Sequence, residues 1–221
     1  MNNDALSDSG TLSASEASRV LRNTYLLLSM TVIFSAVTAV AGLDHVLAPG
    51  ELLMSCIVSL GLLFLTWLMR NSVLGLVAIF AFTGWEGYWI GPVISHYLSY
   101  PNGPHLVATA AGLTGFVFLS LSGYALITRK SFEFLGGFLF SGLLVLVGIG
   151  VLNLFIDMPA LSLALSAAGV MVFCGYVLYD TSRIIHGGQS NYIMATVELY
   201  LDILNLFLDL LRLLSIFMDD D

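Results

Sequence analysis

The sequence IMATVELYLDILNLFLDLLRLLSIFM, residues 193–218, decides the fold because it is a long apolar segment interrupted by five polar residues. On a helix these positions fall within an arc of roughly 80° and form one stripe about 21 Å long. Each ionisable residue at the centre of a bilayer costs on the order of 3 kcal/mol, so the stripe cannot face lipid. We therefore expect a helix enclosed by other apolar segments. The stripe consists of Glu198, Asp202, Asn205, Asp209 and Arg212.

The composition of the chain indicates a membrane protein. Of its 221 residues, 58% are hydrophobic and 10% are charged, which excludes an ordinary soluble domain of this size. Seven apolar runs are long enough to cross about 30 Å of hydrocarbon. The predicted fold class is all-α, a polytopic membrane protein with seven transmembrane helices. The predicted spans are 24–43, 52–69, 73–94, 106–127, 134–156, 160–179 and 193–218.

Basic residues are distributed unequally between the two sets of predicted connections. The connections at 44–51, 95–105 and 157–159 contain no lysine or arginine, whereas the segments on the opposite side contain six. Because positive charge marks the cytoplasmic side, we expect a cytoplasmic N-terminus and, after seven crossings, a periplasmic C-terminus. The six basic residues are Arg19, Arg22, Arg70, Arg129, Lys130 and Arg183.

The sequence predicts two regions, a cytoplasmic N-terminal tail at 1–22 and a seven-helix transmembrane domain at 23–221. The first 17 residues are rich in serine, asparagine and aspartate, a composition typical of disordered segments. Such a tail is either a handle for a partner that grips unfolded segments or a solvated end.

Another ionisable residue, Glu86, interrupts the predicted span 73–94. Counted from the cytoplasmic end, Glu86 lies about 20 Å deep, close to about 18 Å for Asn205 and about 25 Å for Asp209. Glu86 therefore either completes a polar seam with the stripe or hydrogen-bonds a neighbouring tyrosine. The seam itself is either a proton or cation pathway or a buried structural network.

A pair of aspartates is expected where the last two helices meet. Asp180 lies about 10 Å from the glycine pair that ends its helix, and Asp202 lies about 15 Å from the start of the last helix. Antiparallel helices joined by a short turn would place the two carboxyl groups at similar depth. Two such groups cannot both ionise cheaply, so we expect them to share a proton and titrate as a unit. Alternatively, Asp180 pairs with Arg183 or Arg70 at the cytoplasmic interface.

Several stretches of the chain, taken in order, resemble the transmembrane Bax inhibitor motif family. The two most characteristic are LYDTSRIIHGG at 178–188 and ELYLDILNLFLDLLRLL at 198–214. The resemblance continues through nearly the whole chain, in RNTYLLLSM at 22–30, FAFTG at 80–84, GPVISHY at 91–97 and FLGG at 134–137.

The family resemblance implies a seven-helix fold in which six helices surround the last one. It also implies a pH-sensitive calcium leak controlled by two aspartates, which correspond to Asp180 and Asp202. In the calcium-conducting bacterial members an arginine after the second helix latches onto the pair, and here that arginine is Arg70. The sequence departs from those members at 57–63, IVSLGLL, where an acidic residue is missing. Whether Glu86 substitutes for it is left open.

The resemblance is stronger to a bacterial inner-membrane branch that modulates the membrane-anchored AAA protease FtsH. It implies an inner-membrane protein that binds FtsH and its associated membrane regulators, and that modulates degradation of membrane proteins. The alternative is the calcium leak, which can coexist with this role. No cofactor, no nucleic acid and no resident metal is expected, and calcium would bind Asp180 and Asp202 only in transit.

Enzymatic function is not expected. An intramembrane aspartyl protease would need Gly-x-Gly-Asp in the last helix, and this chain has Leu-Tyr-Leu-Asp at 199–202. A retinal protein is excluded because the single lysine, Lys130, lies in a predicted loop. The four histidines also fall in predicted loops, without the i, i+4 spacing of a metal-binding pair.

Overall fold

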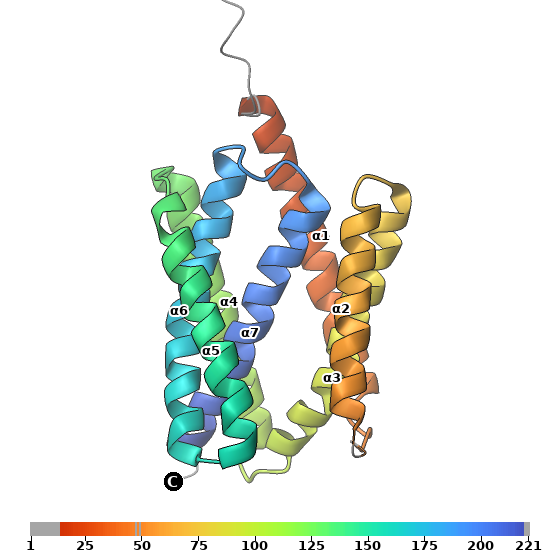
Figure 1. Ribbon diagram of the computed structural model, residues 1–221, viewed down its shortest axis with the longest axis vertical. Helices are drawn as coiled ribbons and strands as arrows, with labels where there is room; N and C mark the ends of the chain where they lie inside the picture. Colours follow the sequence, from red (N-terminus) through yellow and green to blue (C-terminus); the bar gives the residue numbers. More distant parts are fainter. Residues whose placement is uncertain (1–13, 47, 49, 219–221) are drawn as a thin grey trace, which may run out of the picture.

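The computed structural model describes residues 14–46, 48 and 50–218, which fold into seven α-helices and one short 3-10 helix, with no strand in these ranges. The helices run roughly along one axis (Figure 1). The all-α, seven-helix class predicted from the sequence is confirmed. The elements are α1 (Ala14–Ala41), α2 (Glu51–Met69), α3 (Val73–Leu98), α4 (Gly103–Thr128), η1 (Glu133–Leu135), α5 (Gly136–Ile156), α6 (Pro159–Ile185) and α7 (Tyr192–Met218).

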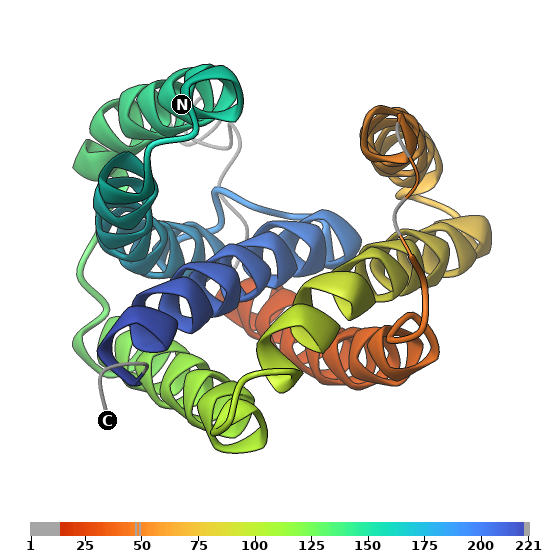
Figure 2. The same ribbon diagram turned by 90° about the horizontal axis from the view of Figure 1, so that it is seen from below.

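Helix α7 is the central element, as its polar stripe predicted. Within the described residues it packs against α1, α2, α3, α4 and α6, whereas α5 packs on α6 and not on α7. Seen along the bundle axis, α7 crosses the middle of the molecule (Figure 2). Helices α1 to α6 are long and apolar enough to span a membrane. Helix α7 is of similar length but carries four charged residues. The helices packed around it shield these charges from lipid.

Helix α1 begins at Ala14, well before the predicted span 24–43. Residues 14–22, predicted as part of the tail, are therefore helical, while residues 1–13 lie outside the described part of the chain. The first turns of α1 project beyond the ends of the other helices (Figure 1). A search for apolar runs finds where a helix enters hydrocarbon, not where its hydrogen bonds begin.

Close packing between α1 and α3 depends on two glycines spaced four residues apart. A Cβ added at Gly91 would lie 2.6 Å from the Cα of Gly42, and one at Gly87 would lie 2.8 Å from the Cα of Ser35. Both neighbours are backbone atoms, which cannot rotate out of the way. The glycines thus allow the two backbones to approach, as is usual where membrane helices pack tightly.

The side of α7 opposite Asp202 is anchored by Tyr200, which is 2% exposed. Its hydroxyl lies 2.8 Å from Oγ of Ser35 and donates to the carbonyl of Thr83 at 3.3 Å. Its ring packs edge-on against Phe82, with centroids 6.1 Å apart. The buried phenol is fully hydrogen-bonded by α1 and α3, so this contact fixes the rotation of α7 and hence the direction of its polar stripe.

The turn between α4 and α5 is attached to the end of α6. Ser182 Oγ accepts from the N–H of Phe132 at 3.0 Å and donates to the carbonyl of Lys130 at 3.2 Å. His186 Nε2 lies 3.1 Å from the carbonyl of Arg129. These bonds hold the last turns of α6, next to Asp180, against a connection 50 or more residues earlier in the chain.

Candidate functional site

Two aspartates meet where α6 and α7 pack together. Asp180 is 5% exposed and Asp202 is 4% exposed, and their carboxyl groups lie within hydrogen-bonding range of each other. No donor in the described part of the chain reaches Oδ2 of Asp202. The structure therefore brings together the pair predicted from the sequence, and one of its oxygens lacks a hydrogen-bond donor.

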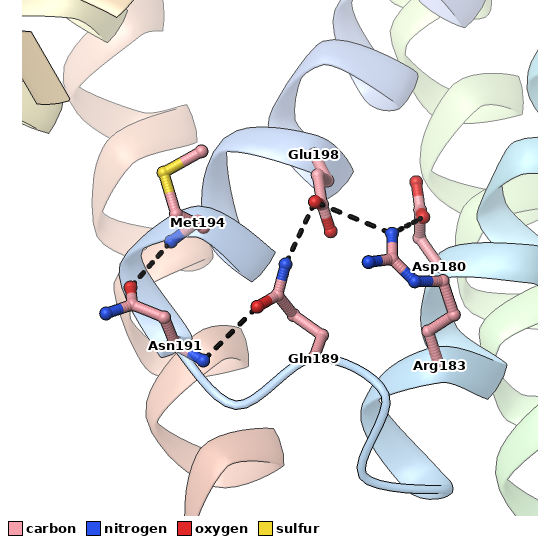
Figure 3. Close-up of polar contacts among 6 residues, drawn as sticks. All are labelled: Asp180, Arg183, Gln189, Asn191, Met194 and Glu198. Carbon is pink, nitrogen blue, oxygen red and sulfur yellow. Dashed lines mark hydrogen bonds and ion pairs between the residues drawn. The ribbon is translucent and has the colours of Figure 1, made fainter. Parts of the chain in front are cut away.

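A third carboxylate and one guanidinium complete this cluster. Arg183 Nη1 lies 3.4 Å from Oδ1 of Asp180 and 3.6 Å from Oε1 of Glu198 (Figure 3). Gln189 Nε2 donates to the same Glu198 oxygen at 2.9 Å. Oε2 of Glu198 is buried without a hydrogen-bond partner among the described residues. Asp180 and Glu198 thus share one arginine, and Asp202 lies beside them without an ion pair in the described ranges, which leaves an excess of carboxylates in the site. We call these four residues the acidic cluster.

Arg70, the arginine expected to latch onto the aspartates, lies elsewhere. Its guanidinium stacks over Trp67, 5.1 Å from the ring centroid, and has no hydrogen-bond or ion-pair partner within the described ranges. Its backbone carbonyl accepts from Asn191 Nδ2 at 2.9 Å. The alternative weighed from the sequence, an ion pair between Asp180 and Arg183, is the contact that forms.

Asn191 builds the support for the start of α7. Its Oδ1 accepts from the N–H groups of Ile193 and Met194, both at 3.1 Å, and so caps the helix. Its Nδ2 donates to Oδ1 of Asn71 at 2.9 Å in addition to Arg70. One side chain therefore holds together the α2–α3 connection and the start of α7. In the sequence, an asparagine shortly after the glycine pair is typical of such a helix cap.

Glu86 takes neither of the two positions considered from the sequence. It is half-buried and hydrogen-bonds the side chain of Ser59 in α2. No bond joins it to the stripe of α7 or to a tyrosine in the part of the chain that the structure describes. The rotation of α3 directs this carboxylate towards α2, and counting residues from the cytoplasmic end gives no information on that rotation.

The C-terminal half of the stripe packs on α6. Asp209 hydrogen-bonds Ser166, and Arg212 Nη1 lies 3.5 Å from the same hydroxyl. A Cβ at Gly169 would overlap the carboxylate of Asp209, so this glycine leaves the space that the carboxylate fills. Ser166 and Gly169 could not be identified from the sequence, because small residues are frequent throughout α4, α5 and α6. Asn205 Nδ2 donates to the carbonyl of Leu201 in its own helix at 2.7 Å.

A buried group of hydroxyls lies beside the acidic cluster and was also missed. Ser122 Oγ is 2.6 Å from the Tyr25 hydroxyl and 2.9 Å from Oγ1 of Thr181. Thr181 follows Asp180 in the sequence and is completely buried. The three hydroxyls join α1, α4 and α6 and form a polar environment that adjoins the aspartate pair.

The chemistry open to the acidic cluster follows from its excess of carboxyl groups over counter-ions. In the described ranges, no group of three or more His, Cys, Asp or Glu side chains is arranged to hold a metal ion. The acidic cluster has three carboxyl groups for one guanidinium, and two of its oxygens lack donors. Such a group can take up a proton, or exchange it for a passing cation.

Comparison with known proteins finds relatives along almost the full length of the chain. It is 45% identical over 197 residues to "Modulator of FtsH protease YccA" of Escherichia coli (strain K12), covering 89% of this chain and 90% of that protein. It is 35% identical over 204 residues to "Protein lifeguard 4" of Mus musculus, covering 88% and 84%. It is 38% identical over 171 residues to "Golgi anti-apoptotic protein" of Vaccinia virus (strain Lister), covering 76% and 70%. None of these three names describes an enzyme.

The match to a protein family is equally extensive. The sequence profile of the family described as "Inhibitor of apoptosis-promoting Bax1" covers residues 17–219, from the first turns of α1 past the end of α7. The matched region includes every residue of the acidic cluster and the whole polar stripe. With its seven helices and this match, the chain is a multi-pass membrane protein that belongs to the Bax inhibitor family.

Proposed function

We propose that this protein is a regulatory membrane protein that binds the membrane-anchored protease FtsH and modulates its degradation of other membrane proteins. The observation that carries the proposal is the 45% identity, over 89% of the chain, to a protein named as a modulator of that protease. Location in the bacterial inner membrane, with a cytoplasmic N-terminus, belongs to the same proposal. The membrane regulators that accompany FtsH are further candidate partners.

The shape of α1 suggests how the protease is engaged. Its first turns project beyond the ends of the other helices (Figure 1), so the start of α1 lies away from the packed bundle. A protease that pulls on unfolded segments needs an accessible chain end, and we propose that residues 1–13 provide it. Ala17 is buried, so a truncation should stop before it in order to leave α1 intact.

Reconstitution with purified FtsH tests this proposal. Full-length protein should slow degradation of a membrane substrate in proteoliposomes, and a variant lacking residues 1–13 should bind and slow the protease less. A variant with these residues replaced by a Gly-Ser linker of equal length shows whether FtsH requires the specific sequence of this segment or only its length. Degradation that is equally fast with and without the full-length protein would disprove the regulatory function.

A second function, a pH-sensitive cation leak, is favoured by the acidic cluster. Asp180 and Asp202 lie in contact and buried, one oxygen of the pair has no donor, and a shared proton would satisfy both groups. When both aspartates are charged, a cation or a reoriented Arg70 would relieve their repulsion. Asn205, Asp209 and Arg212 would continue the polar path towards the far end of α7.

Ion flux into liposomes tests the leak separately from protease binding. Purified protein should admit calcium in a pH-dependent way. Flux equal to that of protein-free liposomes at every pH would eliminate the leak and leave the cluster as a structural network.

A further inference from the structure

A polar cleft lies between the end of α2 and the start of α7, and its wall shares Glu198 with the acidic cluster. Its volume is about 390 Å³. We call it the α2–α7 cleft. Its wall includes Trp67, Arg70, Asn71, Gln189, Met194 and Glu198.

The charge available to a ligand in the α2–α7 cleft is that of Arg70. Oε1 of Glu198 is engaged by Arg183 and Gln189 (Figure 3), Oε2 of Glu198 is buried, and Asn71 accepts from Asn191. The guanidinium of Arg70 has no hydrogen-bond or ion-pair partner in the described ranges, although it is held in place by its stacking on Trp67. A fixed guanidinium with unused donors matches the geometry of a phosphate.

The surface below the cleft is built for lipid. Leu60, Phe64, Trp67 and Leu68 lie on one side of α2 and are each between 46% and 66% exposed, which forms an apolar track that ends at Arg70. Trp67 stacks on Phe64 with centroids 5.7 Å apart, and tryptophan and arginine at the end of a spanning helix mark the headgroup level of a membrane. An acyl chain lying along this track would bring its headgroup to the cleft.

We propose that the α2–α7 cleft binds the phosphate of a membrane phospholipid, with Arg70 as the principal donor and the outer side of α2 as the acyl-chain track. The side-chain amides of Gln189, Asn71 and Asn191 make the rest of the cleft wall polar. A bound phosphate would also hold Arg70 away from the aspartate pair. The effect of a bound lipid on the aspartate pair rests on the cation leak proposed above. The lipid site itself does not depend on whether any ion passes.

Lipid retention measured by native mass spectrometry tests the site. Full-length protein released from nanodiscs of phosphatidylethanolamine or phosphatidylglycerol should keep a phospholipid, and Arg70→Gln should weaken retention by about tenfold, since it removes charge-assisted hydrogen bonds. Arg22→Gln is the matched control, because Arg22 is exposed near the start of α1 and lies outside the cleft. Equal loss in both variants would overturn the proposal.

Further arms distinguish the sources of the phosphate and guard against misfolding. A glycolipid without phosphate should not be retained, and free glycerol phosphate should not displace the phospholipid; the opposite result in either arm rejects a phospholipid site. Arg70→Lys keeps the charge without the planar fork and should retain more lipid than Arg70→Gln. Equal loss in these two variants, at unchanged thermal unfolding midpoints, would overturn the role of the Arg70 charge.

Discussion

At the scale of single residues, the acidic cluster is the feature from which the sharpest predictions come. The aspartate pair was predictable, because the short turn between α6 and α7 fixes the relative depth of the two helices. The choice of Arg183 over Arg70 as the partner of Asp180 was not, since it depends on the position of α2 around the bundle. A hydrophobicity pattern specifies depth but not the angle between non-consecutive helices.

Replacing Asp202 tests the pair as a pH sensor. Asp202→Asn should remove the pH dependence of calcium flux without unfolding the protein, because asparagine keeps the shape and hydrogen-bonding capacity of the side chain while removing its charge. Asp209→Asn is the matched control on the same stripe and should change the amount of flux while keeping its pH midpoint. If wild type, Asp180→Asn and Asp202→Asn had identical pH profiles in liposomes, the pair would not be the sensor.

Removing Arg183 should destabilise the protein through the carboxylates it leaves behind. We expect Arg183→Gln to lower the free energy of unfolding by about 2 kcal/mol, as for a partly buried ion pair that loses one partner. Arg70→Gln should cost about 0.5 kcal/mol, because the guanidinium there only stacks on Trp67. Denaturation in detergent measures both. Equal losses would mean that Arg183 is not the counter-ion of the cluster, and Asp180→Asn should rescue part of the Arg183→Gln loss.

At the scale of helices, packing partners are set by small residues on the contacting sides. Gly91 and Gly87 hold α3 against α1, Gly169 makes room for Asp209 between α6 and α7, and Gly112 in α4 faces open space. In the sequence these glycines cannot be distinguished, because each lies within an apolar segment. These glycines differ in which neighbouring atoms lie opposite them, and this depends on the rotation of each helix about its axis. The rotation could not be predicted from the sequence, because these segments are apolar on all sides.

A pair of glycine substitutions tests this distinction. Gly91→Val would place side-chain atoms against the backbone at Gly42 and should destabilise the bundle by about 2 kcal/mol or more. A Cβ added at Gly112 would meet no atom within 4 Å, so Gly112→Val should leave the thermal unfolding midpoint nearly unchanged. If the two variants unfolded at the same temperature, the close approach of α1 and α3 would not be a source of stability.

At the scale of the whole molecule, the class and the central position of α7 followed from two averaged properties, apolar length and the position of charge. A property averaged over a whole segment changes little when one boundary is misplaced. The number of helices was therefore predicted correctly, although α1 starts at Ala14 rather than at residue 24. The direction of the bundle in the membrane rests on a similar average, the six basic residues that flank spans on one side.

Reporter fusions test that direction. We expect alkaline phosphatase joined to the C-terminus to be active and a cytoplasmic reporter at the same point to be inactive, because seven crossings from a cytoplasmic N-terminus end in the periplasm. Fusions in the α2–α3 connection, beside Arg70, serve as the control and should give the reverse pattern. An inactive phosphatase at the C-terminus would contradict the predicted orientation.

The enclosure of α7 by the other helices also has a consequence for how the protein is made. The penalties for its four charged residues sum to on the order of 10 kcal/mol at the bilayer centre, so this segment is poorly suited to enter lipid alone. Because α7 follows α1 to α6 in the sequence, those six helices have already been synthesised when it leaves the ribosome. Helix α7 can then be inserted directly against α6, where Arg183, Ser166 and the space at Gly169 receive its polar side chains. The order of the sequence thus becomes an order of assembly, in which the helix with the most charged residues is inserted last, into a site formed by the helices before it.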